Sequence, residues 1–86
     1  MHDTFLLSKI SKSLKDICVQ NKIKTIENFV IAVNHNSHIN EENLREHLEI
    51  YNKDNIAHEV KIKILREDIE EQTAIIKILE GETFDN

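Results

Sequence analysis

The feature that most constrains this fold is the run of β-branched and aromatic residues between Lys24 and Val33. Apolar side chains occupy both odd- and even-numbered positions of this run, a pattern typical of a strand with much of both faces apolar. The apolar members are Ile26, Phe29, Val30, Ile31 and Val33. Such a strand needs packing partners, so it predicts a small domain in which other elements cover it.

Amphipathic helices are predicted on both sides of this strand. The first runs from Asp3 to about Gln20, with Asp3 or Thr4 as N-cap. Its apolar stripe comprises Leu6, Ile10, Leu14 and Ile17, widened by Leu7 and Cys18. Asn40 is a good N-cap for the second helix, Glu41 to about Asn52. The stripe of this second helix comprises Leu44, His47, Leu48 and Tyr51.

Two further strands follow the helices. His58–Leu65 alternates in polarity, with Val60, Ile62 and Ile64 on one face. The acidic segment Glu67–Glu71 predicts a hairpin loop, and Thr73–Glu80 predicts the last strand, which Gly81 ends before a loose or edge segment to Asn86. In this last strand the pattern predicts one inward and one outward set: Ala74, Ile76 and Ile78 inward, and Ile75, Lys77 and Leu79 outward.

The resulting order is helix, strand, helix, strand, strand. A strand–helix–strand unit gives parallel neighbours, and a short loop gives an antiparallel pair. We therefore expect an α+β fold with a three-stranded mixed sheet and both helices on one face. Leu65, Ile75, Leu79 and part of the first strand would lie on the uncovered face, a candidate surface for a homodimer or another partner.

Composition sets limits on function. The 86 residues suit one domain, and 40% hydrophobic with 31% charged residues is typical of a soluble globular chain. A net charge of −5 without a basic cluster argues against nucleic acid or an anionic membrane as partner, so the set Lys9, Lys12 and Lys15 is interpreted as a solvated face. No apolar run is long enough for a membrane span, which makes the cytoplasm the expected location.

The first three residues, Met1-His2-Asp3, form a candidate metal site. The α-amine of Met1, the backbone nitrogens of His2 and Asp3, and the His2 imidazole can converge on one ion. Four nitrogens in a plane suit Ni(II) or Cu(II), whereas zinc prefers a tetrahedron and magnesium prefers oxygen. Alone, the motif is also compatible with an untethered terminus.

The order of the elements, and the residues in the loops and turns between them, resemble those of the hydrogenase/urease nickel-incorporation metallochaperones, the HypA-type family. That family begins Met-His-Glu before an amphipathic helix, as Met1-His2-Asp3 does here. Its loop before Glu-x-Leu is similar to Val33–Ser37 followed by Glu42-Asn43-Leu44. Its Lys-Gly-Thr-x-Ala turn before an alternating strand is similar to Lys53–Ala57 before Val60–Ile64. The resemblance runs without insertion from Met1 to about Leu65.

Two departures from the family pattern carry expectations. Asn34 and Asp54 stand where the family usually has glycine, and Asn and Asp tolerate positive φ best among other residues, so we expect both turns to survive. After Asp68 the family inserts a zinc module with two Cys-x-x-Cys pairs. This chain has only a short loop near residues 67–72, and the strand after it resembles the family's closing strand. The resemblance therefore implies a single nickel-binding domain over residues 1–86 without structural zinc.

The resemblance implies a nickel metallochaperone, not an enzyme, with Met1, His2 and Asp3 as ligands. It further implies docking to a nickel-handling GTPase and to a nickel-enzyme apoprotein. The alternative is a protein-interaction or assembly module that keeps the fold and binds no metal. Because protons compete for amine and imidazole ligands, whose ordinary pKa values are near 8 and 6.5, we expect metal binding to weaken below about pH 6.5.

The remaining candidate residues have plainer interpretations. His35 and His38 could hold a second ion or donate an auxiliary ligand, but a solvated loop is the simpler account. His47 lies on an apolar stripe and suits half-buried packing better than ligation, and His58 has no assigned role. The single cysteine, Cys18, is expected in the core, which argues against a reactive thiol. One glycine in the whole chain excludes a glycine-rich phosphate loop.

Overall fold

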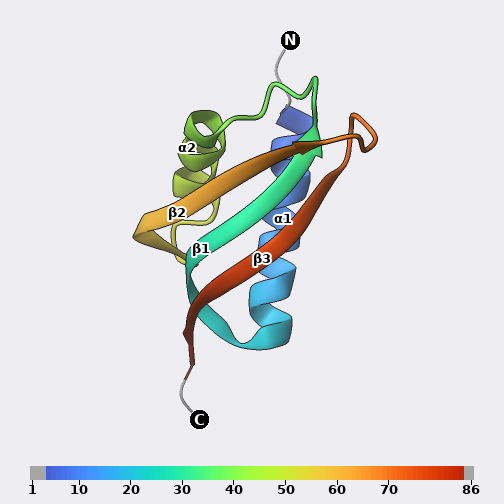
Figure 1. Cartoon of the computed structure of the whole chain (residues 1–86). Helices are drawn as coiled ribbons and strands as arrows, with labels where there is room; N and C mark the ends of the chain where they lie inside the picture. The colour runs from blue at the N-terminus through green and yellow to red at the C-terminus, as the bar shows by residue number, and fades with distance from the viewer. Residues whose placement is uncertain (1–3, 85–86) are drawn as a thin grey trace.

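The protein is a two-layer α+β domain in which both helices cover one face of a three-stranded mixed sheet (Figure 1). The computed structural model describes residues 4–84. Along the chain the elements are α1 (Thr4–Asn21), β1 (Ile23–Asn34), α2 (Glu41–Tyr51), β2 (Ile56–Glu67) and β3 (Ala74–Thr83). The predicted fold class and element order are confirmed. Within the described range, neither helix has the length and apolar character needed to cross a membrane.

The strand order is β2-β1-β3, so the most apolar strand lies in the centre of the sheet. β1 pairs with β2 in parallel, as a strand–helix–strand unit predicts, and with β3 in antiparallel. The predicted hairpin between β2 and β3 is therefore wrong, because these strands are the two edges and the chain crosses the end of β1 between them. With β3 beside it, β1 has backbone hydrogen-bond partners along both edges. This suits the most apolar strand, which is least suited to be an exposed edge.

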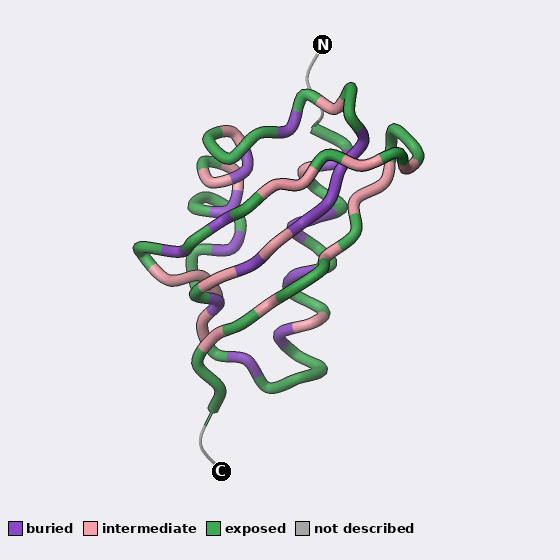
Figure 2. Tube along the Cα trace, viewed as in Figure 1, coloured by how far each residue is buried: buried purple, intermediate pink, exposed green. Residues whose placement is uncertain are grey.

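The core lies between the helices and the sheet (Figure 2). α1 contributes Leu6, Ile10 and Leu14, of which none is more than 3% exposed. β1 contributes its helix-facing residues Ile26, Phe29, Ile31 and Val33, all fully buried. The predicted apolar stripe of α1 is thereby confirmed. In α2, Leu44 and Leu48 are buried, but Tyr51 is 57% exposed and does not belong to the stripe as predicted.

A β-bulge at Lys77 changes the faces of the second half of β3. Ile76 pairs with Ile31, but the next β1 residue back, Val30, pairs with Ile78, so Lys77 is the extra residue. Beyond this point the alternation is reversed. Leu79 packs against the core and Ile78 is 48% exposed, the opposite of the prediction for these two side chains. An added strand residue shifts every later side chain to the other face, which polarity alone does not reveal.

Gly81 does not end β3 as predicted, because the strand continues to Thr83. Gly81 lies opposite Ile26, beside a second irregularity at Glu27 of β1. A Cβ at position 81 would stand 2.0 Å from the backbone oxygen of Thr25. The glycine therefore permits the close approach of two backbones within the sheet.

A buried polar pair joins the two helices. The Ser11 hydroxyl donates to Oδ1 of Asn52, and Nδ2 of Asn52 donates to the backbone oxygen of Ser11 at 3.1 Å. Both residues are at most 5% exposed, and Asn52 directly follows α2. The reciprocal hydrogen bonds satisfy both buried side chains and fix the end of α2 against the middle of α1.

Candidate metal centre

The predicted ligands Met1, His2 and Asp3 lie outside the described residues. The structure does describe the element that follows them directly. α1 begins at Thr4, and Leu6, two residues later, is only 1% exposed. The chain is thus anchored to the core within one helical turn of the candidate ligands.

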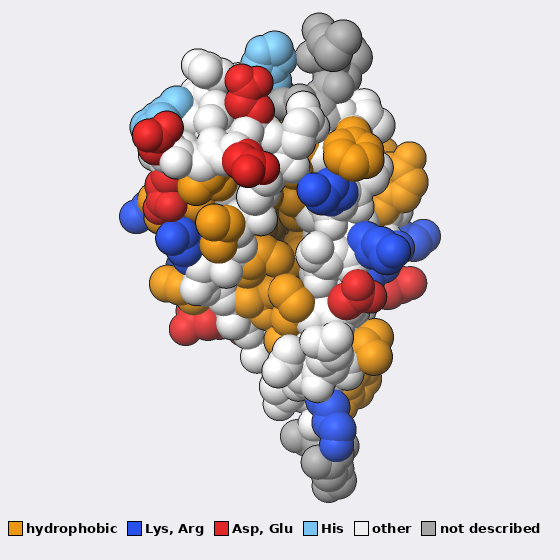
Figure 3. Space-filling view, turned by 90° about the vertical axis from the view of Figure 1, so that its right-hand side faces the viewer, with side chains coloured by type: hydrophobic (Ala, Val, Ile, Leu, Met, Phe, Trp, Pro, Cys, Tyr) orange, Lys and Arg blue, Asp and Glu red, His pale blue; other side chains and the backbone are white. Residues whose placement is uncertain are grey.

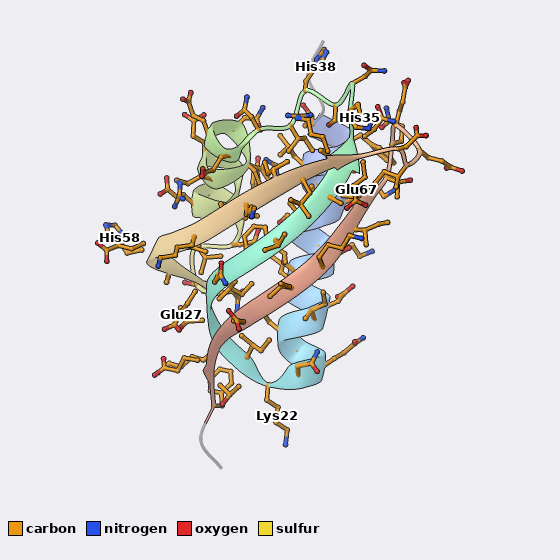
Figure 4. The ribbon with its side chains drawn as sticks, in the orientation of Figure 1. Lys22, Glu27, His35, His38, His58 and Glu67 are labelled. Carbon is orange, nitrogen blue, oxygen red and sulfur yellow. The ribbon has the colours of Figure 1, made fainter. Side chains whose placement is uncertain are left out.

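The start of α1 lies at the same end of the molecule as the loop that follows β1 (Figure 1). We call this the loop end; it comprises Thr4 and residues 35–40. His35 and His38 belong to this loop, both are exposed, and Figure 4 places both at this end. Histidine side chains are also visible at the upper end in Figure 3. The fold therefore brings the two loop histidines to the end at which the chain enters α1.

Arg66 and Asn34 hold the loop end in place. The Arg66 guanidinium donates to the backbone oxygens of Ser37 at 2.8 Å and Ile39 at 2.6 Å, with a longer bond of 3.4 Å to that of Asn34. Oδ1 of Asn34 accepts from the backbone nitrogen of Asn36 at 2.7 Å, and its Nδ2 donates to the backbone oxygen of Ile69. One asparagine thus fastens both loops that cross the end of β1.

The last part of the loop is fixed by the cap of α2. Asn40 is the N-cap, as predicted, and it exchanges hydrogen bonds of 2.8 and 2.9 Å with Asn43. Nδ2 of Asn43 also donates to the backbone oxygen of His38 at 2.8 Å, and Ile39 is fully buried beside it. The backbone that carries His38 is therefore positioned by both Arg66 and Asn43.

The expectation of positive φ at Asn34 and Asp54 is wrong. Lys22, in the turn between α1 and β1, is the only non-glycine residue with positive φ among residues 4–84. Asn34 instead forms a turn through its side chain, which is an alternative way for asparagine to reverse the chain. The chain reversal after Asn34 thus uses a side-chain hydrogen bond and not a positive φ.

Two titratable groups are affected by burial. Cys18 is 3% exposed, as expected of a core residue, and burial raises the pKa of its thiol. A raised pKa disfavours the thiolate, so Cys18 lacks the activation that nucleophilic catalysis requires. His47 is half-buried, its ring centroid lies 4.5 Å from that of Tyr51, and burial lowers the pKa of its imidazole. Both observations agree with packing roles.

No group of three or more His, Cys, Asp or Glu side chains suited to holding a metal occurs within residues 4–84. His58 stands on the outer edge strand β2, away from His35 and His38 (Figure 4). Among residues 4–84 the histidines therefore lie in three places: His35 and His38 at the loop end, His47 in α2 and His58 in β2. His58 serves as the control for the histidines of the loop end.

Sequence reasoning missed the residues that position the loop end. Arg66 was not singled out, because a lone arginine at the end of an alternating strand gives no signal of the carbonyl groups it will meet. Asn43 was also missed, since the third position of a capping box is usually Glu or Gln. The spacing Asn40-x-x-Asn43 is the one signal that could have indicated it.

Comparison of the chain with models of protein families, with curated proteins and with solved structures finds no match.

Proposed function

We propose that this protein is a nickel-binding metallochaperone that binds Ni(II) at its N-terminus for delivery to a nickel enzyme. The proposed ligands are the Met1 amine, the His2 amide and imidazole, and the Asp3 amide. The observation that carries the proposal is the direct continuation of this motif into α1, which is anchored in the core from Leu6 onward. The start of α1 itself lies at a defined end of the molecule (Figure 1).

The chemistry of these ligands suits a cargo metal. An amine, two deprotonated amide nitrogens and an imidazole form a planar set that Ni(II) and Cu(II) accept. The set uses no side chain of the core, so binding and release need no unfolding of the domain. Protonation of the amine and imidazole opposes binding, and transfer is therefore favoured wherever the pH falls or a recipient offers stronger ligands.

The loop end lies where the chain enters α1 (Figure 1). Arg66 and Asn43 fix the backbone on which His38 stands, and His38 lies at the same end as the start of α1 (Figure 4). An exposed imidazole on a positioned backbone can serve as an auxiliary ligand during transfer. We further propose a cytoplasmic location, with a nickel-handling GTPase and a nickel-enzyme apoprotein as partners.

The second candidate function is a protein-interaction module that holds no metal. The observation in its favour is the uncovered face of the sheet, where Ile75 and Ile78 are 40% and 48% exposed. Apolar side chains of this size in an open sheet face are typical of an interaction surface. This function is independent of the N-terminal motif, and the two are separable by experiment.

The test is a Ni(II) titration followed by calorimetry and visible absorption, on tag-free protein that retains Met1. We expect near-stoichiometric binding and the yellow colour of a planar complex, both lost in His2→Ala. His58→Ala is the matched control, because it removes an exposed histidine far from the loop end, and it should bind like the native protein. Binding that survives His2→Ala, or no binding at all, contradicts the proposal and favours the interaction module.

A further inference from the structure

We draw no further inference here: the strongest candidate, the apolar patch around Ile75 and Ile78 on the face of the sheet that the helices leave uncovered, carries no proposal, because nothing in the structure shows what covers it.

Discussion

The two faces of the sheet use the same strand in different ways. On the helix-covered face β1 presents Phe29, Ile31 and Val33, all fully buried, and these side chains build the core. On the open face, which the helices leave uncovered, the alternate residues Val30 and Ala32 lie beside both apolar and charged neighbours, among them Ile78 and Lys63. Apolar content alone therefore does not distinguish a residue that maintains the fold from one that is available for contact. Four comparisons follow, each of which pairs a substitution with a control at another site of the molecule.

The largest expected effect compares the neighbours Ile31 and Val30 in β1. Ile31→Ala removes fully buried atoms and should lower the free energy of unfolding by about 2–5 kcal/mol. Val30→Ala lies on the open face, where its side chain is half-buried, and should cost about 1 kcal/mol or less. Urea denaturation measures both. Equal losses of unfolding free energy in Ile31→Ala and Val30→Ala would mean that both faces of β1 contribute alike to stability.

The next comparison tests the bulge at Lys77. Leu79→Ala should cost about 1–3 kcal/mol, because Leu79 packs against the core, whereas Ile78→Ala should cost less than about 1 kcal/mol. Without a bulge, Ile78 would face the core and Leu79 the open face, so Ile78→Ala would then cost more stability than Leu79→Ala. The same denaturation experiment decides, and a larger loss for Ile78→Ala would show that β3 has no bulge.

A smaller difference in stability loss is expected between substitutions of two basic residues, Arg66 and Lys77. Arg66→Met removes the donors to the backbone oxygens of Ser37 and Ile39 and should cost about 1–2 kcal/mol. Lys77→Met removes an exposed ion pair on the open face and should cost less than about 0.5 kcal/mol. Arg66→Met should also speed amide exchange at the loop end, measured by hydrogen exchange. Unchanged exchange there would mean that Arg66 does not hold the loop.

The smallest effect concerns pH. Burial lowers the pKa of His47, so below the ordinary imidazole pKa of about 6.5 the unfolded chain binds a proton that the folded chain resists. This contribution to stability is present above that pH and is lost as the pH falls through it toward the lowered folded value. In His47→Phe, which keeps a ring beside Tyr51, the loss of melting temperature between about pH 7.5 and pH 5.5 should be smaller. His58→Phe, a change at an exposed histidine, should retain the native loss.

The periodicity of the sequence was sufficient to predict the elements and the layer arrangement. Both helices, the parallel pair of β1 and β2, and the cap at Asn40 follow from local patterns that the structure confirms. The strand order was not predictable in this way, because a short acidic loop allows a hairpin as well as a crossing over the end of β1. In the structure the crossing loop is held by Asn34, whose side chain donates to the backbone oxygen of Ile69, a contact between residues far apart in sequence.

The bulge and Gly81 escaped prediction for a related reason. Polarity along β3 fits unbroken alternation equally well, and only the packing of Leu79 against the core selects the bulged register. Gly81 was expected to end the strand, whereas it allows the approach of the Thr25 backbone. For the candidate site, the sequence predicts the ligands Met1, His2 and Asp3, which lie outside residues 4–84, and these ligands stay a prediction. The loop-end contacts of Arg66 and Asn43 became visible only in three dimensions.

The measurement that tests the central claim most directly is a Ni(II) titration of the native protein beside the same protein acetylated at the α-amine. Acetylation removes one proposed ligand and changes no side chain, so it separates coordination by the terminus from coordination by any histidine. We expect near-stoichiometric planar binding in the native protein and its loss on acetylation, with unfolding by heat unchanged in the absence of metal. Nickel binding of equal affinity after acetylation would contradict the N-terminal site and the nickel-chaperone function proposed from it.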